Sequence, residues 1–134
     1  MLGTDDYTKR LHLHVDKIAN EQEIGFPDLK AKISFVSSDE AAEALYFLLE
    51  QPGTGPINVC SDGSMELQEL VGLIEKATNK KAKLASEINE QNQSPFGLSA
   101  SWYMSNEKAK AAGFQVQKLD YWLPLLIGQL AVKE

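Results

Sequence analysis

The chain has 134 residues, of which 43% are hydrophobic and 24% charged, and it carries a net charge of −6 at pH 7. These totals predict one domain over residues 1–134, and the acidic charge disfavours nucleic acid and anionic membranes as partners because both would be repelled. With no apolar run near the roughly 20 residues that span a bilayer, no secretion signal and a single cysteine, Cys60, the predicted location is the reducing cytoplasm.

The first element is predicted to be a helix. Thr4 is placed to cap it, and the helix would run to about Glu21 with Leu11, Val15 and Ile18 on one face. The middle of this stretch also alternates as a strand would, so both interpretations stay open here.

Residues 31–36 predict a short strand, and the helix that follows has a clear start and end. Ser37 and Glu40 have the spacing of a capping box, and Glu40 is expected to be a first-turn charge rather than a catalytic acid. Pro52 and Gly53 end the helix. Its buried face is predicted to be a stripe of five apolar residues: Ala41, Ala44, Leu45, Leu48 and Leu49.

The next elements are a strand, a helix and another strand. Residues 57–60 are apolar except for Asn58 and lie between turn signals, which predicts a buried strand. Ser64 is predicted to cap a helix, and residues 81–85 predict a further strand before a polar loop at 86–95. The inner face of the helix is predicted to hold Leu67, Leu70, Val71, Ile74 and Ala77.

Two helices complete the chain. Ser105 is predicted to cap a short one that ends at Gly113. Asp120 precedes the last helix, whose start is expected close to Pro124 because proline is tolerated within the first turn. One face of this helix holds Trp122, Leu123, Leu126, Ile127 and Leu130. Strands that alternate with helices predict an α/β fold with a small sheet and four or five helices.

The glycines at 53–63 raise the question of a phosphate-binding loop. A dinucleotide loop needs the order strand, glycines, helix, because only that order aims the helix N-terminus at the pyrophosphate. Gly53 and Gly55 have the reverse order, between a helix and a strand. The junction at residues 60–64 has the right order but contains only Gly63, which predicts a capped turn.

Metal binding and nucleophilic catalysis find little support. His12 and His14 are the only histidines, and no third ligand stands near them. Cys60 ends a predicted buried strand with no histidine close in sequence, which favours packing over nucleophilic attack.

Several segments share the order of elements of one protein family. Phe35 and Val36 end a predicted strand, which leads into the acidic and alanine-rich start of a helix at residues 39–42. The predicted strand at 57–59 and a capped helix follow. The segment "SNEKAKAAGF", residues 105–114, comes after them. This order resembles the C-terminal half of extended short-chain dehydrogenase/reductase proteins, the NAD(P)-dependent epimerases, dehydratases and reductases, many of which act on nucleotide sugars. The resemblance implies an α/β lobe without a complete Rossmann domain.

The catalytic and cofactor-binding motifs of that family have no counterpart among these residues. No glycine loop is present, and no tyrosine is followed by a lysine four residues later, as the family's Y-x-x-x-K pair requires. The position of its diphosphate-binding arginine holds Ile33. We therefore expect no catalytic residue, metal or cofactor in this chain, and NAD or NADP only in an intact parent protein.

The resemblance implies a substrate-binding lobe that is not catalytic alone and that grips a sugar-like small molecule. Its partner would be a missing Rossmann half, or a second copy, on an exposed apolar face. A free-standing binding or interaction module that has lost its catalytic half is the alternative, and a small enzyme of unrelated mechanism is a third possibility. The implied substrate-binding residues are Gly25, Phe26, Ser37, Ser94, Pro95 and Phe96.

Overall fold

The computed structural model describes residues 1–51, 53 and 55–132. Within these residues it contains five helices and four two-residue strands, which confirms the predicted α/β fold with a small sheet. The elements in chain order are α1 (Arg10–Ala19), β1 (Glu23–Ile24), β2 (Lys32–Ile33), α2 (Ser38–Leu49), β3 (Met65–Glu66), α3 (Leu67–Thr78), β4 (Lys83–Leu84), α4 (Glu107–Ala111) and α5 (Leu119–Val132).

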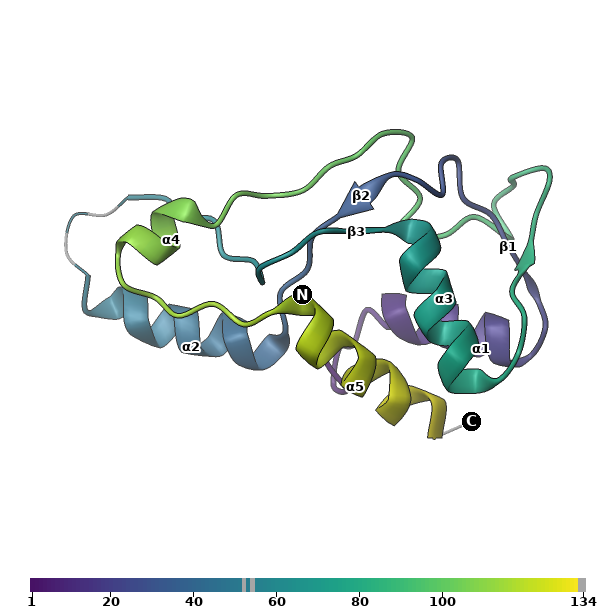
Figure 1. Ribbon diagram of the computed structural model, residues 1–134, viewed down its shortest axis with the longest axis horizontal. Coiled ribbons are helices and arrows are strands. Elements are labelled where there is room, and N and C mark those ends of the chain that lie inside the picture. The colour runs from purple at the N-terminus through teal and green to yellow at the C-terminus, as the bar shows by residue number, and fades with distance from the viewer. Residues whose placement is uncertain (52, 54, 133–134) are drawn as a thin grey trace.

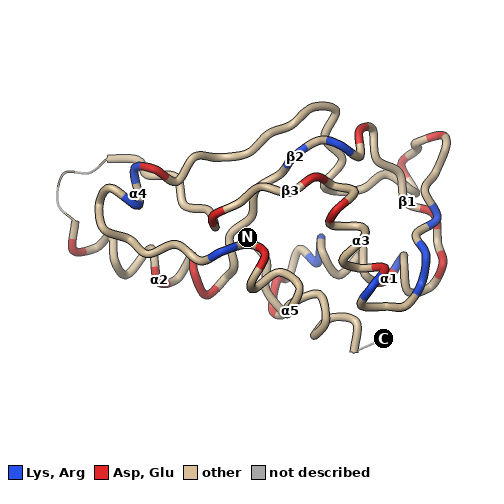
Figure 2. The backbone as a smooth tube through the Cα atoms, viewed as in Figure 1, with Lys and Arg blue, Asp and Glu red and all other residues tan. Residues whose placement is uncertain are grey.

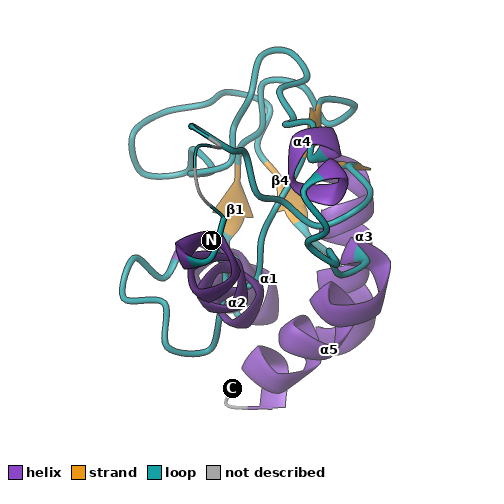
Figure 3. Cartoon of the chain, turned by 90° about the vertical axis from the view of Figure 1, so that its left-hand side faces the viewer, coloured by secondary structure: helices purple, strands orange, loops and turns teal. Residues whose placement is uncertain are grey.

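The helices form two groups at opposite ends of the molecule. Helices α1, α3 and α5 pack against one another, and α2 lies with α4 at the other end (Figure 1). In the view along the long axis, β1, β4 and most of the loops lie to one side of α1 and α5 (Figure 3). The larger core therefore sits among three helices, and a smaller cluster joins Ala44 of α2 to Ala109 of α4 and Phe114.

The larger core follows the predicted apolar faces closely. All predicted face residues of α1 and α5 are buried, and in α3 only Ala77 is exposed. Helix α1 starts at Arg10 and not at Thr4, because residues 6–9 form a turn instead. The Thr8 N–H and hydroxyl both donate to Asp6 Oδ1, and Lys9 has a φ of 51°, a left-handed conformation that interrupts a helix.

The prediction that α5 starts close to Pro124 was wrong. It begins at Leu119, where the N–H groups of Tyr121 and Trp122 donate to the Lys118 carbonyl. Pro124 leaves the Asp120 carbonyl without a helical donor, and Asp120 is exposed, so water can serve that carbonyl. An exposed side of the second turn tolerates this proline.

Helix α2 begins as predicted but turns a different face inward. The Ser37 Oγ accepts the Glu40 N–H at 3.0 Å, which confirms the cap. Leu45 and Leu49, predicted to be buried, are 69% and 85% exposed. The helix ends at Leu49; Gly53 has a φ of 73°, and the predicted stop at Pro52 lies outside the described residues.

The strands are shorter than predicted, and one is missing. From residues 31–36 only β2 forms, paired antiparallel with β3, and from 81–85 only β4 forms, paired parallel with β1. Residues 57–60, predicted to be a buried strand, form none: their N–H groups make no hydrogen bond within the described chain. A strand requires a neighbour, and none lies beside this run in the part of the chain that the structure describes.

Two predicted caps also move. Ser64 was predicted to cap α3, but residues 65–66 after it form β3, so the N-cap of α3 is Glu66. The cap of α4 is Asn106, although the Ser105 hydroxyl accepts the Glu107 N–H at 3.3 Å. None of the helices within the described residues has the length and apolar character that crossing a membrane requires.

Candidate functional site

Two adjoining cavities lie around the segment that leads into α1. The first cavity, of about 700 Å³, lies between residues 2–5, the start of α2 and the outer face of α5. The second cavity, of about 520 Å³, lies on the other side of the same segment, toward residues 95–102. Both are lined by Leu2, Gly3, Asp5 and Ser38, so these residues divide them.

Gly3 permits the close contact that separates the cavities. A Cβ added at this position would lie 2.3 Å from the Ser38 Oγ and 3.0 Å from Asp5 Oδ1. These two oxygens would have to rotate away, and the Ser38 Cβ, 3.1 Å from the added carbon, would have to shift slightly, so glycine favours the close approach of the N-terminal segment to α2. The Leu2 backbone also holds the N-terminal segment against α2, because its N–H donates to the Val36 carbonyl and its carbonyl accepts the Ser38 N–H.

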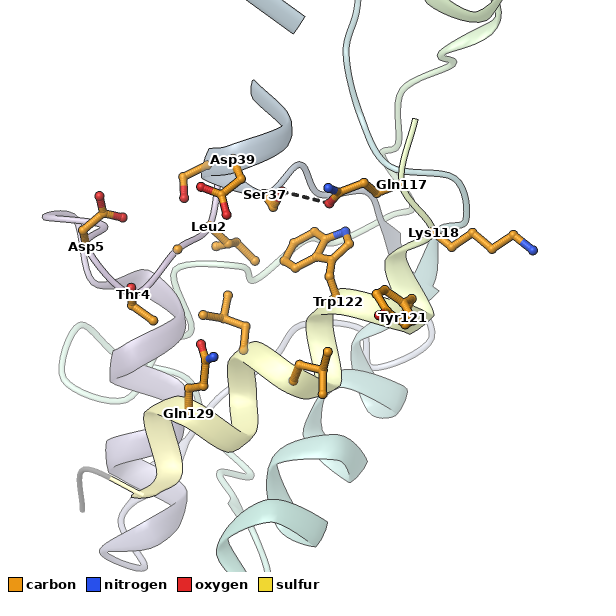
Figure 4. A pocket seen from close by; sticks show the side chains of 14 residues that line it. Leu2, Thr4, Asp5, Ser37, Asp39, Gln117, Lys118, Tyr121, Trp122 and Gln129 are labelled. Carbon is orange, nitrogen blue, oxygen red and sulfur yellow. Dashed lines mark hydrogen bonds between the residues drawn. The ribbon is translucent and has the colours of Figure 1, made fainter. Parts of the chain in front are cut away.

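An indole ring forms the floor of the first cavity. Trp122 is 9% exposed, and its Nε1–H donates to the Ser61 Oγ at 2.7 Å. The Ser37 hydroxyl donates to the Gln117 Oε1 at 3.2 Å beside this ring, and Lys118 extends away at the rim (Figure 4). The cavity thus offers an aromatic surface with hydroxyl and amide groups around it.

A buried acid supports this floor from behind. Glu40 is fully buried, with its Oε1 accepting the Ser61 hydroxyl and its Oε2 accepting the Gln117 N–H, each at 2.5 Å. Glu40 lies in the first turn of α2 as expected, but its side chain also has a buried role that the sequence did not indicate. No local pattern could reveal this role, because the two partners lie 21 and 77 residues away in sequence.

A buried histidine stands behind the second cavity. The His14 Nδ1 lies 2.6 Å from the Arg10 carbonyl oxygen, and its Nε2 lies 2.6 Å from the Ser94 Oγ. The Phe96 ring stacks on the imidazole with ring centres 4.6 Å apart. Burial lowers the pKa of His14 to about 4; the bond to the Arg10 carbonyl opposes the shift, and the charge of Lys17 adds to it.

The predicted substrate-binding residues fall in three places. Gly25, Phe26, Ser94 and Phe96 gather around His14: the Ser94 N–H donates to the Gly25 carbonyl at 2.8 Å, and the Phe26 and His14 ring centres are 5.9 Å apart. Of the six residues, Pro95 and Phe96 line the second cavity, and Ser37 lines the first. Their roles in binding stay predictions, and His14, which contacts Phe26, Ser94 and Phe96, was missed.

The second cavity also contains the only arginine of the chain. The position of the family's diphosphate-binding arginine holds Ile33, but Arg10 reaches this cavity from the start of α1. Trp102, 75% exposed, lines the cavity as well. A guanidinium beside an aromatic face is suited to anionic and ring-shaped ligand groups. Only the fold brings these two residues together.

The turn at Gly63 does not fit the pyrophosphate of NAD(P). Helix α3 follows the glycine turn at Gly63, but its cap is Glu66 and its first turn carries Glu69, so negative charge stands where a phosphate would bind. No group of three or more potential metal ligands occurs within the described residues.

No protein-family model and no curated protein matches the chain. Several solved structures are similar to it, including the following three. RMD from Pseudomonas aeruginosa complexed with NADPH matches with a TM-score of 0.67 and 16% identity, over 97% of this chain and 45% of that chain. The UDP-glucose 4-epimerase of Thermus thermophilus in complex with NAD matches with a TM-score of 0.68 and 15% identity, over 92% and 40% of the two chains. The UDP-glucose 4-epimerase of Thermotoga maritima with UDP-glucose matches with a TM-score of 0.65 and 16% identity, over 91% and 39%.

This chain has the fold of part of these proteins, two of which are UDP-glucose 4-epimerases. The resemblance inferred from the sequence is therefore confirmed at the level of the fold. The chain spans less than half the length of each of these proteins. The ligands in their titles belong to those proteins, and what they imply for this chain is a matter of proposal.

Proposed function

We propose that the chain is the substrate-binding lobe of an NAD(P)-dependent sugar epimerase, dehydratase or reductase and does not catalyse the reaction alone. The observation that carries this proposal is the unequal coverage of the fold match: nearly all of this chain against less than half of each neighbour. NAD or NADP would bind to the other half of such a protein, a view that the acidic residues at the start of α3 support.

The second cavity supports binding of a sugar-like molecule. Phe96 and Trp102 offer aromatic surface, and Arg10 and Asp5 offer a donor and an acceptor for hydrogen bonds. Its volume of about 520 Å³ lies in the range of small-molecule sites, which combine apolar walls with a few polar groups. The first cavity adjoins it, so a ligand with two parts could extend past Gly3.

The outer face of α2 supports the view that this lobe docks on another half. We call Leu45, Tyr46 and Leu49 the docking face; they are 69%, 71% and 85% exposed. Only acidic charges occur on α2 (Figure 2), so the matching surface would be apolar with basic residues at its edge. A free-standing module, the alternative function, would be expected to carry polar residues on this face.

Ligand titration tests the proposal directly. UDP-glucose added to the ¹⁵N-labelled chain should shift the amide signals of Phe96 and Trp102, and NADH should shift none. The variant Trp102→Ala should weaken the response, whereas Tyr103→Ala, an exposed aromatic next to it that does not line the cavity, should not. Tight NADH binding, turnover by the chain alone, or no response to UDP-glucose would contradict the proposal.

A further inference from the structure

The loop that closes one side of the second cavity meets a buried histidine of α1, in addition to the backbone bond between Ser94 and Gly25. We call residues 94–96 the cavity wall; Pro95 and Phe96 line the cavity, and Ser94 lies behind them. The Ser94 Oγ meets the Nε2 of His14 at 2.6 Å, across 80 residues of sequence. His14 is fully buried in α1, so this contact fixes a loop on a rigid helix.

The hydrogen bonds around His14 require one protonation state of the ring. A carbonyl oxygen can only accept, so the Nδ1 must carry the hydrogen that is donated to the Arg10 carbonyl. In the neutral ring the Nε2 is then a bare acceptor, and the Ser94 hydroxyl donates to it. The Ser94 Oγ in turn accepts the Phe96 N–H at 3.0 Å. The bonds therefore run in one direction from Phe96 through Ser94 to His14.

A proton added to the ring would reverse this arrangement. The Nε2 would become a donor facing the Ser94 hydroxyl, whose own hydrogen would lose its acceptor. The new charge would also be buried without a carboxylate beside it. Phe26, Ser94 and Phe96, which contact the ring, have no titratable side chain, and on α1 the neighbours are the cations Arg10 and Lys17.

We propose that His14 is the positioning residue of the second cavity: its neutral ring holds the 94–96 wall in place, and protonation of the ring releases the wall. The low pKa of about 4 that burial gives His14 supports this device, because it keeps the ring neutral near neutral pH. The inference concerns the cavity that the proposed function assigns to substrate. Its test uses the free chain, so it succeeds or fails independently of which molecule binds there.

A pH titration by NMR tests the coupling. The labelled variant His12→Gln has His14 as its only imidazole, so the ring signal can be followed from pH 7.5 to 3.5. The ring and the amides of Ser94 and Phe96 should shift together with a midpoint near 4. Over the same range, the protection factor of the Phe96 amide, which corrects the exchange rate for its intrinsic dependence on pH, should fall about tenfold, as expected when one hydrogen bond opens.

Matched variants separate this role from ordinary packing. His14→Phe keeps an aromatic ring against Phe96 but cannot titrate, so the wall should no longer respond to pH. If that variant does not fold, Ser94→Ala gives the same test: the ring should still titrate without moving the wall, and Ser94→Thr should restore the coupling.

Three results would overturn the inference. The first is a His14 ring that titrates while the wall amides stay unchanged. The second is a wall response that persists in Ser94→Ala. The third is simultaneous loss of protection in the core amides of α5, which would mean that acid unfolds the whole chain.

Discussion

Replacing Glu40 should destabilise the chain more than replacing any exposed acid. In Glu40→Ala the Ser61 hydroxyl and the Gln117 N–H lose their acceptor while still buried behind the first cavity. Each unsatisfied donor costs about 1–3 kcal/mol, so the expected loss in the free energy of unfolding is about 4 kcal/mol. Because small domains unfold with a total of about 5–15 kcal/mol, this single change would remove a large share.

Glu40→Gln should cost less, because its one carbonyl oxygen still serves one of the two donors. Its amide nitrogen would face the other donor, so we expect a loss of about 2 kcal/mol. Urea unfolding followed by tryptophan fluorescence measures both variants, since Trp122 donates to the same Ser61 hydroxyl. With a slope near 2 kcal/mol per M, the midpoint should fall by about 2 M for the alanine variant and about 1 M for the glutamine variant.

The matched control is Glu43→Ala, which removes an exposed acid from the same helix. It should change the free energy of unfolding by no more than about 0.5 kcal/mol. If Glu40→Ala were as mild as the control, the two short hydrogen bonds would contribute little, and the proposed role of Glu40 in holding the cavity floor would be wrong.

Three further predictions concern the cavities and the docking face. Gly3→Ala places a methyl carbon 2.3 Å from a serine oxygen of α2 and should cost about 1–3 kcal/mol in urea unfolding; no loss would mean that the contact relaxes freely. The chain should self-associate with rising concentration in light scattering, and the double change Leu45→Glu with Leu49→Glu should suppress this, whereas Val132→Glu, an equally exposed site on α5, should not. The folded state holds His14 neutral down to about pH 4, but the unfolded chain protonates it near 6.5, so the stabilisation is present above 6.5 and is lost as pH falls to 4. This loss should amount to about 3 kcal/mol relative to His14→Phe in unfolding measurements at pH 7 and pH 4, and equal slopes in both proteins would contradict it.

The helices of the larger core could be predicted because their signal is local. Apolar residues at helical spacing bury themselves wherever a neighbouring helix offers a matching face, and α1, α3 and α5 satisfy one another in this way. The start of α1 was harder to place, since one aspartate turn at residues 6–8 replaced the expected first turn.

The site could be predicted only in part because it depends on contacts across the sequence. The family resemblance selected Ser94 and Phe96, and these residues do meet behind and beside one cavity. It could not select His14, for which the spacing of the two histidines predicts a surface or partly buried residue rather than a metal ligand. The partners of His14 and Glu40 lie 80 and 77 residues away, and no local pattern contains that information.

The two clearest errors of the sequence analysis occur at one end of the molecule and have one cause. The stripe on α2 and the run at 57–60 both have the composition of buried structure, but Leu45 and Leu49 are exposed and the N–H groups of the run are unpaired within the described chain. Side chains of Ile57 and Val59 pack on the same small cluster as α2. An exposed apolar helix face can cover a sheet of a second domain, and an extended run with unpaired N–H groups can pair with the edge strand of such a sheet. The same features that misled the prediction are therefore the ones that support docking on a second half.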